Sequence, residues 1–405
     1  MKIKNIVTSI AAGAALLTFA GIAAAAPTMT GDINIYGASA QFNFWKGQAA
    51  NYMSAAGCTS LQSSKTTDGK NAITKGTCGG VTRYFRTSSK ASYDGPLAVQ
   101  GNTTNPNRTT ACSNPHDRMM MEESAVTSWG TTASPTTMPN TAVACKTVNG
   151  GASDVMVSSF QQISYGQLYG PNTSGGVVSR DFTGAGAVNS SGLTDCRTLV
   201  VPFAFYMNNG VKKGGVQATN LTTAQARLIF SGQIVDWSDL GVGYDAQPIT
   251  TCWRHAGSGT AAALDFDVMR PAGLQTQEDT GNGYSFYFND GSADLMACVN
   301  GAAGGVGYAD ADQSLASYPN THRVTYNGVD ATKANITAGL YDFYTIQNLY
   351  TATPVPTDMT NLCTFMSKPA NNTNPMYSTP CEMQYIRAND VTYSQYNGDF
   401  GNCPL

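Results

Sequence analysis

The chain has 405 residues, of which 42% are hydrophobic and 12% charged, and its formal net charge is −3. This length supports two domains, each with a core of its own. A charge-poor, slightly acidic chain lacks the basic surface that binds nucleic acid or anionic membranes, so nucleic acid is excluded as a partner. Any anion must therefore be bound by local geometry.

The N-terminus has the pattern of a secretory signal peptide. Lys2 and Lys4 precede an apolar run over Ile10–Ala20, and a run of alanines follows. We expect residues 1–25 to be the signal peptide, with cleavage after Ala25 and a periplasmic or secreted mature protein. The apolar run is too short for a membrane anchor and no other stretch approaches the required length, so we predict that the chain is not membrane-spanning.

Ten cysteines in an exported chain indicate disulfide bonds, although the spacing leaves their connectivity open. No Cys-x-x-Cys pair occurs and the three histidines are scattered, so we expect no metal and no cofactor. Pairing neighbours along the chain gives Cys58–Cys78, Cys112–Cys145, Cys252–Cys298 and Cys363–Cys381, with Cys196 left for Cys403.

The first third of the mature chain predicts a strand, a turn and a helix, followed by a long polar region. Alternation and helical spacing of the apolar residues support the first unit. In order, we expect a strand over Asp32–Tyr36, a small-residue turn over Gly37–Gln41, a helix over Phe42–Met53, a polar loop over Cys58–Gly80, and a strand over Val81–Thr87 that ends at Ser88 and Ser89.

Residues 101–150 are rich in Asn, Thr, Ser and Pro, which predicts a disulfide-tied insertion. Its apolar cluster is Met119, Met120 and Met121. These thioethers suit a soft-metal or partner surface, but core filling is the favoured interpretation. At the end of the insertion, small residues precede Asp154, which is placed either to hold a ligand hydroxyl or to cap a turn.

The remaining elements alternate between strands and helices, which predicts an α/β architecture with mostly parallel sheets. The continuous apolar run Leu199–Met207 is typical of a strand buried on both faces. We expect helices over Thr222–Phe230, Thr332–Ala338 and Met359–Met366, and strands over Gly305–Ala309, Val324–Val329 and Tyr341–Tyr350.

The stretch from Ile249 to Arg270 has the pattern of a strand, a tight loop and a helix N-terminus. A β-branched run ends at Arg254, a Gly-Ser-Gly-Thr turn follows over Gly257–Thr260, and an alanine-rich helix comes next. Unpaired N–H groups and the positive end of a helix dipole at such a junction make an anion cradle. The alternative is a flexible turn with Thr260 as the helix N-cap.

Six short motifs follow one another along the chain. They are GASAQF at Gly37–Phe42, GASD at Gly151–Asp154, IFSGQIVDWSDL at Ile229–Leu240, RHAGSGT at Arg254–Thr260, GVGY at Gly305–Tyr308 and YNGV at Tyr326–Val329. In this order they resemble motifs of the substrate-binding proteins of phosphate ABC importers. The resemblance implies a periplasmic binding protein fold of the second type, with two α/β lobes, two crossover strands and the ligand between the lobes. The crossovers would be Leu199–Met207 and Tyr341–Tyr350, lobe one 30–207 with 341–405, and lobe two 208–340.

Carried over by residue, the resemblance implies an anion site built from both lobes. A buried oxyanion needs many donors and a guanidinium, and a carboxylate that accepts the proton of a protonated phosphate would exclude sulfate. Three residues depart from the family pattern: Ala256 replaces an aspartate, Gln41 a threonine and Ser39 a glycine. The implied ligand-binding residues are Gln41, Phe42, Ser88 or Ser89, and Asp154 from lobe one, and Arg254, Ser258, Gly259 and Thr260 from lobe two.

The leading hypothesis is a binding protein, not an enzyme, that captures phosphate or a related oxyanion and presents it to a membrane ABC permease. No Gly-x-Ser-x-Gly elbow or metal triad supports catalysis. One alternative is a cell-surface or extracellular structural or adhesive protein that retains the fold without transport, in view of the Asn/Thr-rich insertion, the many cysteines and the aromatic tail. A weaker alternative is phosphate-ester hydrolysis on the same scaffold.

Overall fold

The computed structural model describes residues 26–102, 112–160, 187–255, 257–270, 285–387, 390 and 395–396. The predicted signal peptide, Ala256 and Cys403 lie outside these residues. Within these ranges, no helix combines the length and the apolar character needed to cross a membrane.

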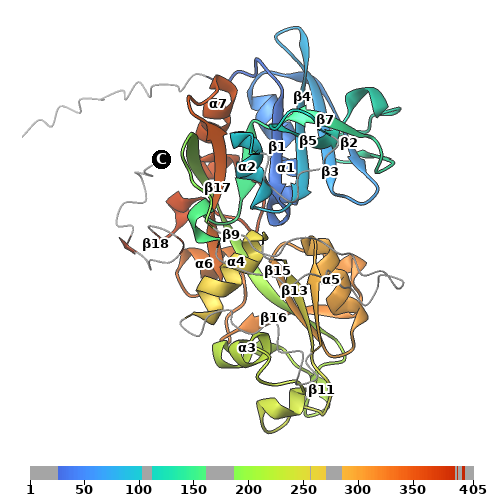
Figure 1. Cartoon of the computed structure of the whole chain (residues 1–405), viewed down its shortest axis with the longest axis vertical. Coiled ribbons are helices and arrows are strands. Elements are labelled where there is room, and N and C mark those ends of the chain that lie inside the picture. Colours follow the sequence, from blue (N-terminus) through green and yellow to red (C-terminus); the bar gives the residue numbers. More distant parts are fainter. Residues whose placement is uncertain are drawn as a thin grey trace, which may run out of the picture.

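The fold is organised around two long strands in the middle of one mixed sheet. β9 (Leu193–Asn208) and β17 (Tyr344–Ala352) pair antiparallel, and the 13-stranded sheet continues on both sides of them in the order β14-β13-β15-β9-β17-β8-β1-β4-β3-β2-β6. In Figure 1 the two strands run along the molecule from its upper half to its lower half. They are the two predicted crossovers, and the apolar run of β9 is fully buried, as expected for a strand covered on both faces.

β9 changes partners part of the way along its length. Its residues up to Pro202 pair with β17, whereas Phe203 and the residues after it pair with β15 (Gly305–Asp310) and β16 (Thr321–Tyr326). The sheets are mixed, so the prediction of mostly parallel sheets is wrong. Parallel pairing is found at the centre of each half and at two outer strand pairs, and the crossovers and hairpins add antiparallel strands.

The upper half is centred on β1 (Ile33–Ala38), which lies parallel to β4 (Val81–Lys90) and β8 (Gly150–Ser153). The predicted helix after β1 is confirmed as α1 (Phe42–Ala55), preceded by a 3-10 turn over Ser39–Gln41.

The prediction of a polar loop between Cys58 and Gly80 is wrong. This segment forms an antiparallel hairpin of β2 (Thr59–Thr66) and β3 (Asn71–Cys78). The segment is rich in Ser and Thr, so its sequence lacks the alternation of apolar and polar residues that indicates a strand. Its Ser and Thr residues pair across the strands through hydroxyls instead, with 2.8 Å between Ser63 Oγ and Thr74 Oγ1.

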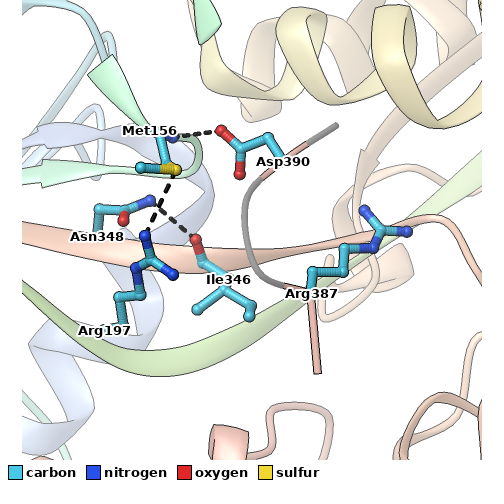
Figure 2. A pocket seen from close by; sticks show the side chains of 6 residues that line it. All are labelled: Met156, Arg197, Ile346, Asn348, Arg387 and Asp390. Atoms are coloured by element: carbon cyan, nitrogen blue, oxygen red, sulfur yellow. Dashed lines mark hydrogen bonds between the residues drawn. The ribbon is translucent and has the colours of Figure 1, made fainter. Parts of the chain in front are cut away.

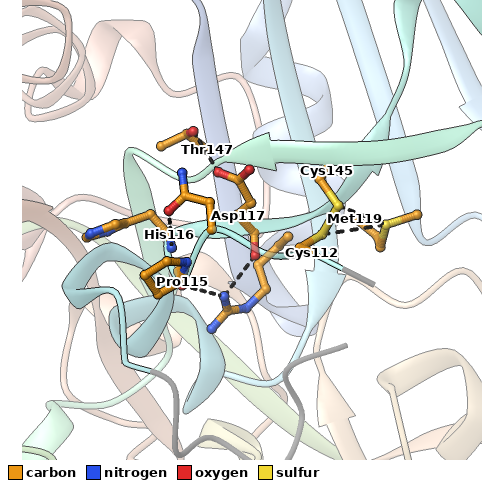
Figure 3. Close-up of a disulfide and its surroundings, with 9 residues drawn as sticks. Cys112, Pro115, His116, Asp117, Met119, Cys145 and Thr147 are labelled. Atoms are coloured by element: carbon orange, nitrogen blue, oxygen red, sulfur yellow. Dashed lines mark hydrogen bonds between the residues drawn. A yellow bond between two sulfur atoms is a disulfide. The ribbon is translucent and has the colours of Figure 1, made fainter. Parts of the chain in front are cut away.

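The insertion contains a second small hairpin, of β5 (Asp117–Met121) and β7 (Val143–Thr147), and the disulfide Cys112–Cys145 ties it together. Figure 3 shows Met119 beside this disulfide, with its sulfur 3.8 Å from each cysteine sulfur. Met120 and Met121 are fully buried, which confirms the core-filling interpretation for these two residues.

The lower half is centred on β13 (Thr250–Arg254), which lies parallel to both β14 (Ser285–Asn289) and β15. The predicted helix over Thr222–Phe230 is confirmed as α3 (Thr223–Phe230), which begins with a capping box between Thr222 and Gln225. α5 (Ser292–Gly301) and β14 were not predicted. The remaining elements are α2 (Asp94–Gln100), β6 (Thr136–Met138), β10 (Lys212–Lys213), β11 (Val216–Gln217), β12 (Asn220–Leu221), α4 (Gly259–Ala263), α6 (Lys333–Thr337), α7 (Thr357–Met366), β18 (Tyr385–Ile386) and β19 (Gln395–Tyr396).

Three of the predicted disulfides are confirmed, namely Cys58–Cys78, Cys112–Cys145 and Cys252–Cys298. Cys196 of β9 is bonded to Cys363 of α7, 167 residues away. The predicted pairs Cys363–Cys381 and Cys196–Cys403 are therefore wrong. Pairing of neighbours fails here because α7 packs against β9 in space, and spacing along the chain carries no information about that contact.

Candidate functional site

The N-terminus of α4 lies where the lower half of the molecule meets the upper half (Figure 1). A Cβ added to Gly259 would lie 2.5 Å from Ser92 Oγ and 2.8 Å from Asp154 Cβ. Just before the helix, the Gly257 carbonyl accepts a hydrogen bond of 3.0 Å from Tyr93 N. The predicted Gly-Ser-Gly-Thr junction therefore directly contacts residues that follow β4 and β8.

Arg254 is the last residue of β13 and is 1% exposed. Its Nε and Nη2 donate to the carbonyls of Asn289 and Asp290 at 3.3 and 3.0 Å. Its Nη1 donates to Thr260 Oγ1 at 3.5 Å and to Ser292 Oγ at 3.3 Å. Because these two hydroxyl oxygens accept from the guanidinium, their own hydrogens are directed elsewhere and suit a further acceptor. Burial lowers the pKa of Arg254, although neighbouring carboxyls oppose the shift.

α4 begins with a side-chain cap. Ser258 is the N-cap, and its Oγ accepts from Ala261 N at 3.4 Å, so Thr260 is not the cap. His255 Nδ1 accepts from Gly257 N at 3.2 Å and shapes the turn before the helix. α4 continues without a break into a π-helical segment over Leu264–Met269.

Asp154 follows β8 directly and is 1% exposed. Gln41 Nε2 donates to its Oδ1 at 2.8 Å, and Ser92 Oγ donates to its Oδ2 at 3.1 Å. Burial raises the pKa of Asp154 from 3.8 to about 6, and the two donors and Arg254 oppose this shift. The result is a buried carboxyl that is mostly ionised at pH 7 and held by two protein donors.

The other predicted residues of the upper half lie near the carboxyl ends of β1 and β4. Ser88 pairs in register with Tyr36, and Ser89 with Gly37. Ser88 Oγ is buried and has no hydrogen-bond partner among the described residues. The same holds for the hydroxyl of Ser39, next to the N-terminus of α1, where Phe42 is the first residue.

The structure thus brings Gln41, Asp154 and Gly259 together, and Arg254 with Thr260. Two further residues take part that were not predicted, Ser92 and Ser292. Ser92 lies three residues beyond Ser89, and it bonds Asp154 where Ser88 and Ser89 do not. The Gly-Ser-Ala-Asp sequence at the start of α5 is a helix-start signal that would have indicated Ser292.

A separate pocket lies beside the crossover strands, with about 210 Å³ of empty space including the part open to solvent. Figure 2 shows its lining residues, Met156, Arg197, Ile346, Asn348, Arg387 and Asp390. None of them is a predicted site residue.

The charged groups at this pocket bind other parts of the protein. Asp390 accepts from Met156 N and Ser159 Oγ, each at 2.5 Å. Arg387 is paired with the buried Asp267 of the π-helical segment. The segment around Arg387 therefore touches both halves of the molecule. Among the described residues, no cluster of His, Cys, Asp or Glu could hold a metal ion.

The mixed α/β fold matches the two-lobed structures of periplasmic binding proteins. Residues 175–366 match the family model described as a PBP superfamily domain. This match covers somewhat less than half of the chain and is similarity to that domain. The architecture agrees with the two-lobed fold that the sequence motifs predicted.

One solved structure supports the fold, and a second has a lower TM-score. A putative phosphate ABC transporter substrate-binding protein with bound phosphate from Clostridium perfringens is similar over 86% of this chain and 99% of its own, with a TM-score of 0.50 and 13% identity. An ABC-type phosphate transport receptor from Vibrio cholerae covers 84% of this chain and 95% of its own, with a TM-score of 0.44 and 13% identity. The first of these supports the fold, and at this identity it supports nothing finer.

Proposed function

We propose that this protein binds phosphate or a related small oxyanion between its two lobes and delivers it to a membrane ABC permease. One observation carries the proposal: a buried guanidinium and a buried carboxyl, Arg254 and Asp154, lie on the two sides of the contact between α4 and the other lobe. The Clostridium perfringens protein of similar fold is described with phosphate bound.

The chemistry of the two lobes is complementary for a protonated oxyanion. On one side, Arg254 provides positive charge. Hydrogen-bond donors come from the hydroxyls of Ser258 and Thr260 and from the backbone at Gly259. On the other side, Asp154 is an acceptor at neutral pH because its pKa is about 6. Phosphate carries a proton that it can donate in a hydrogen bond to Asp154, whereas sulfate has none, so its oxygens would face the buried carboxylate without a hydrogen bond.

The remaining proposed contacts come from the first lobe, at Gln41, Phe42, Ser88 and Ser89. The buried hydroxyl of Ser88 supports its inclusion, since an unpartnered buried donor is unfavourable unless a ligand uses it. The lobe limits remain those predicted, 30–207 with 341–405, and 208–340. Export, cleavage after Ala25 and a periplasmic or secreted location belong to the same proposal, which the disulfides support. No catalytic role is proposed.

Isothermal calorimetry on the purified mature protein tests the function, with phosphate, arsenate, phosphonates and sulfate as ligands. We expect phosphate to bind, sulfate to fail, and Arg254→Ala to abolish binding because it removes the buried positive charge. Arg254→Lys keeps the charge without the fork of donors and should bind more weakly than wild type.

Arg323→Ala is the matched control, because this arginine of the same lobe pairs with Asp330 at 3.2 Å, outside the site. Circular dichroism of each variant separates lost binding from lost folding. A wild-type protein that responds to none of the anions would contradict the proposal and favour the structural or adhesive alternative.

A further inference from the structure

Gln41 lies at the start of α1, and its side-chain amide is held in one orientation. The side chain is 0% exposed. Its Oε1 accepts from Trp45 Nε1 at 3.1 Å and also from Gln347 Nε2. The indole N–H of a tryptophan can only donate, so the oxygen of the Gln41 amide must face Trp45. The amide nitrogen then necessarily faces the other way, toward Asp154.

The two neighbours that fix Gln41 come from different parts of the fold. Trp45 is one turn further along α1, and both residues belong to the same buried face. Gln347 lies in β17, one of the two crossover strands. The orientation of the amide therefore depends on the helix and on a crossover strand at once.

We propose that Gln41 is a positioning residue that holds Asp154 as a pure acceptor for the ligand's proton, and does not itself act mainly as a ligand contact. This inference rests on the proposed function. Gln41 Nε2 occupies one lone pair of Oδ1 and Ser92 Oγ one lone pair of Oδ2. A carboxylate has about four such acceptor positions, so about two remain for a donor on the ligand.

Positioning by Gln41 also determines which protonation state of the anion is preferred. Hydrogen bonds to a carboxylate favour its ionised form. Without the Gln41 donor, Asp154 would keep its own proton to a higher pH and would itself donate. A protein whose buried carboxyl donates no longer discriminates against an anion that lacks a proton, so selectivity for phosphate over sulfate should fall.

The test compares Gln41→Met with wild type, because methionine retains the volume and removes both hydrogen-bonding ends. Phosphate and sulfate dissociation constants are measured by calorimetry between pH 5.5 and pH 8.5. We expect Gln41→Met to weaken phosphate binding on the order of tenfold at pH 7, to reduce the phosphate-to-sulfate ratio, and to move the acid limit of phosphate binding to higher pH.

Gln48→Met is the matched control. Gln48 is also a buried glutamine of α1, but its side-chain partners are Thr373 and Asn51, so all three quantities should stay at their wild-type values. Gln41→Glu extends the test. It places a second carboxyl against Asp154, and two adjacent carboxyls share a proton at neutral pH. Asp154 is then no longer fixed as an acceptor by a neutral amide, so this variant should bind phosphate more weakly than wild type, as Gln41→Met should.

The titration of Asp154 in the ligand-free protein, followed by carboxyl-carbon NMR, separates the two proposals. If wild type binds no oxyanion, the proposed function fails, and a higher Asp154 pKa in Gln41→Met still establishes the positioning. If wild type binds phosphate but Gln41→Met leaves affinity, selectivity and the Asp154 titration unchanged, the positioning role is overturned and the proposed function stands.

Discussion

Asp154 makes the stability of the ligand-free protein depend on pH in an unusual direction. Its pKa is raised by burial from 3.8 to about 6 in the folded state, so between these values the folded protein holds a proton that the unfolded chain has lost. The contribution of Asp154 to stability is therefore greatest below pH 4, falls as the pH rises to about 6, and stays low above it.

We predict that Asp154→Asn removes this dependence. Each pH unit between the two pKa values changes the free energy of unfolding by about 1.4 kcal/mol. The stability of the variant relative to wild type should therefore rise by about 3 kcal/mol between pH 4 and pH 7. Urea unfolding of both proteins at the two pH values, in buffer free of oxyanions, measures the difference.

Asp195→Asn is the control variant for Asp154→Asn. Burial also raises the pKa of Asp195 to about 6, but this residue lies in β9 and pairs with Arg197. The stability of Asp195→Asn relative to wild type should therefore also rise between pH 4 and pH 7, but its phosphate binding should stay intact, whereas Asp154→Asn should also lose the binding. Equal stability differences at pH 4 and pH 7 for Asp154→Asn would contradict the argument.

At the scale of the elements, the disulfide Cys196–Cys363 joins a crossover strand to the helix that packs on it. Its separation of 167 residues is much longer than the 20 residues of Cys58–Cys78. In the chain-entropy account, a disulfide stabilises by constraining the unfolded chain, and it does so more for a longer loop.

We predict that replacing Cys196 and Cys363 together by serine lowers the free energy of unfolding by about 5 kcal/mol, against about 3 kcal/mol for the Cys58 and Cys78 pair. Guanidinium unfolding of the two double variants gives both values. A larger loss from the short loop would show that native packing around Cys58–Cys78, and not loop length, determines the cost.

The elements that could be predicted are those whose signals are local. The capping box of α3 depends only on Thr222 and Gln225, which are three residues apart. The apolar run of β9 consists of consecutive residues. The β2–β3 hairpin was missed because its strands are built of Ser, Thr and Lys, whose pairing depends on partners across the sheet. The Cys196–Cys363 bond was missed for the same reason, since no local feature shows that α7 packs on β9.

The candidate site divides in the same way. Asp154 and Arg254 stand at the ends of strands next to small-residue turns, so their motifs were sufficient to select them. The parts played by Ser92 and Ser292 arise only when separate elements meet, and the role of Gln41 depends on Trp45 and Gln347 together. Motifs therefore selected the charged groups of the candidate site, and only the fold revealed the side chains that bond to them.

At the scale of the whole molecule, contacts between the two halves surround the candidate site. Lys70, between β2 and β3, reaches Asp294 of α5 at 3.0 Å and Asp290 at 3.6 Å. Tyr93 and Gly257 are joined through their backbones. The ion pair of Lys70 is partly exposed, so it adds little stability by itself. The close packing at Gly259 restricts the contact between the two halves more strictly than this ion pair does, because it leaves no space for a side chain.

We predict that Gly259→Ala prevents this approach while leaving each lobe folded. The new Cβ would lie 2.5 Å from Ser92 Oγ and 2.8 Å from Asp154 Cβ. The serine hydroxyl can rotate away, but the Asp154 Cβ can move only with its backbone. Alanine is otherwise favourable in a helix, so the variant should stay folded and bind phosphate more weakly, by on the order of tenfold or more.

Small-angle scattering and calorimetry on the same sample distinguish this effect from general destabilisation. Once phosphate is bound, the wild-type protein should have the compact radius of gyration of this structure. Gly259→Ala should remain more extended at saturating phosphate.

Gly47→Ala is the control, because Gly47 is an exposed helical glycine with nothing within 4 Å of the added Cβ. That change should stabilise the protein by about 0.5–1 kcal/mol and leave binding unaltered. Should Gly259→Ala bind phosphate as tightly as wild type, the ligand does not require the contact between α4 and Asp154, and the anion must then be held within one lobe.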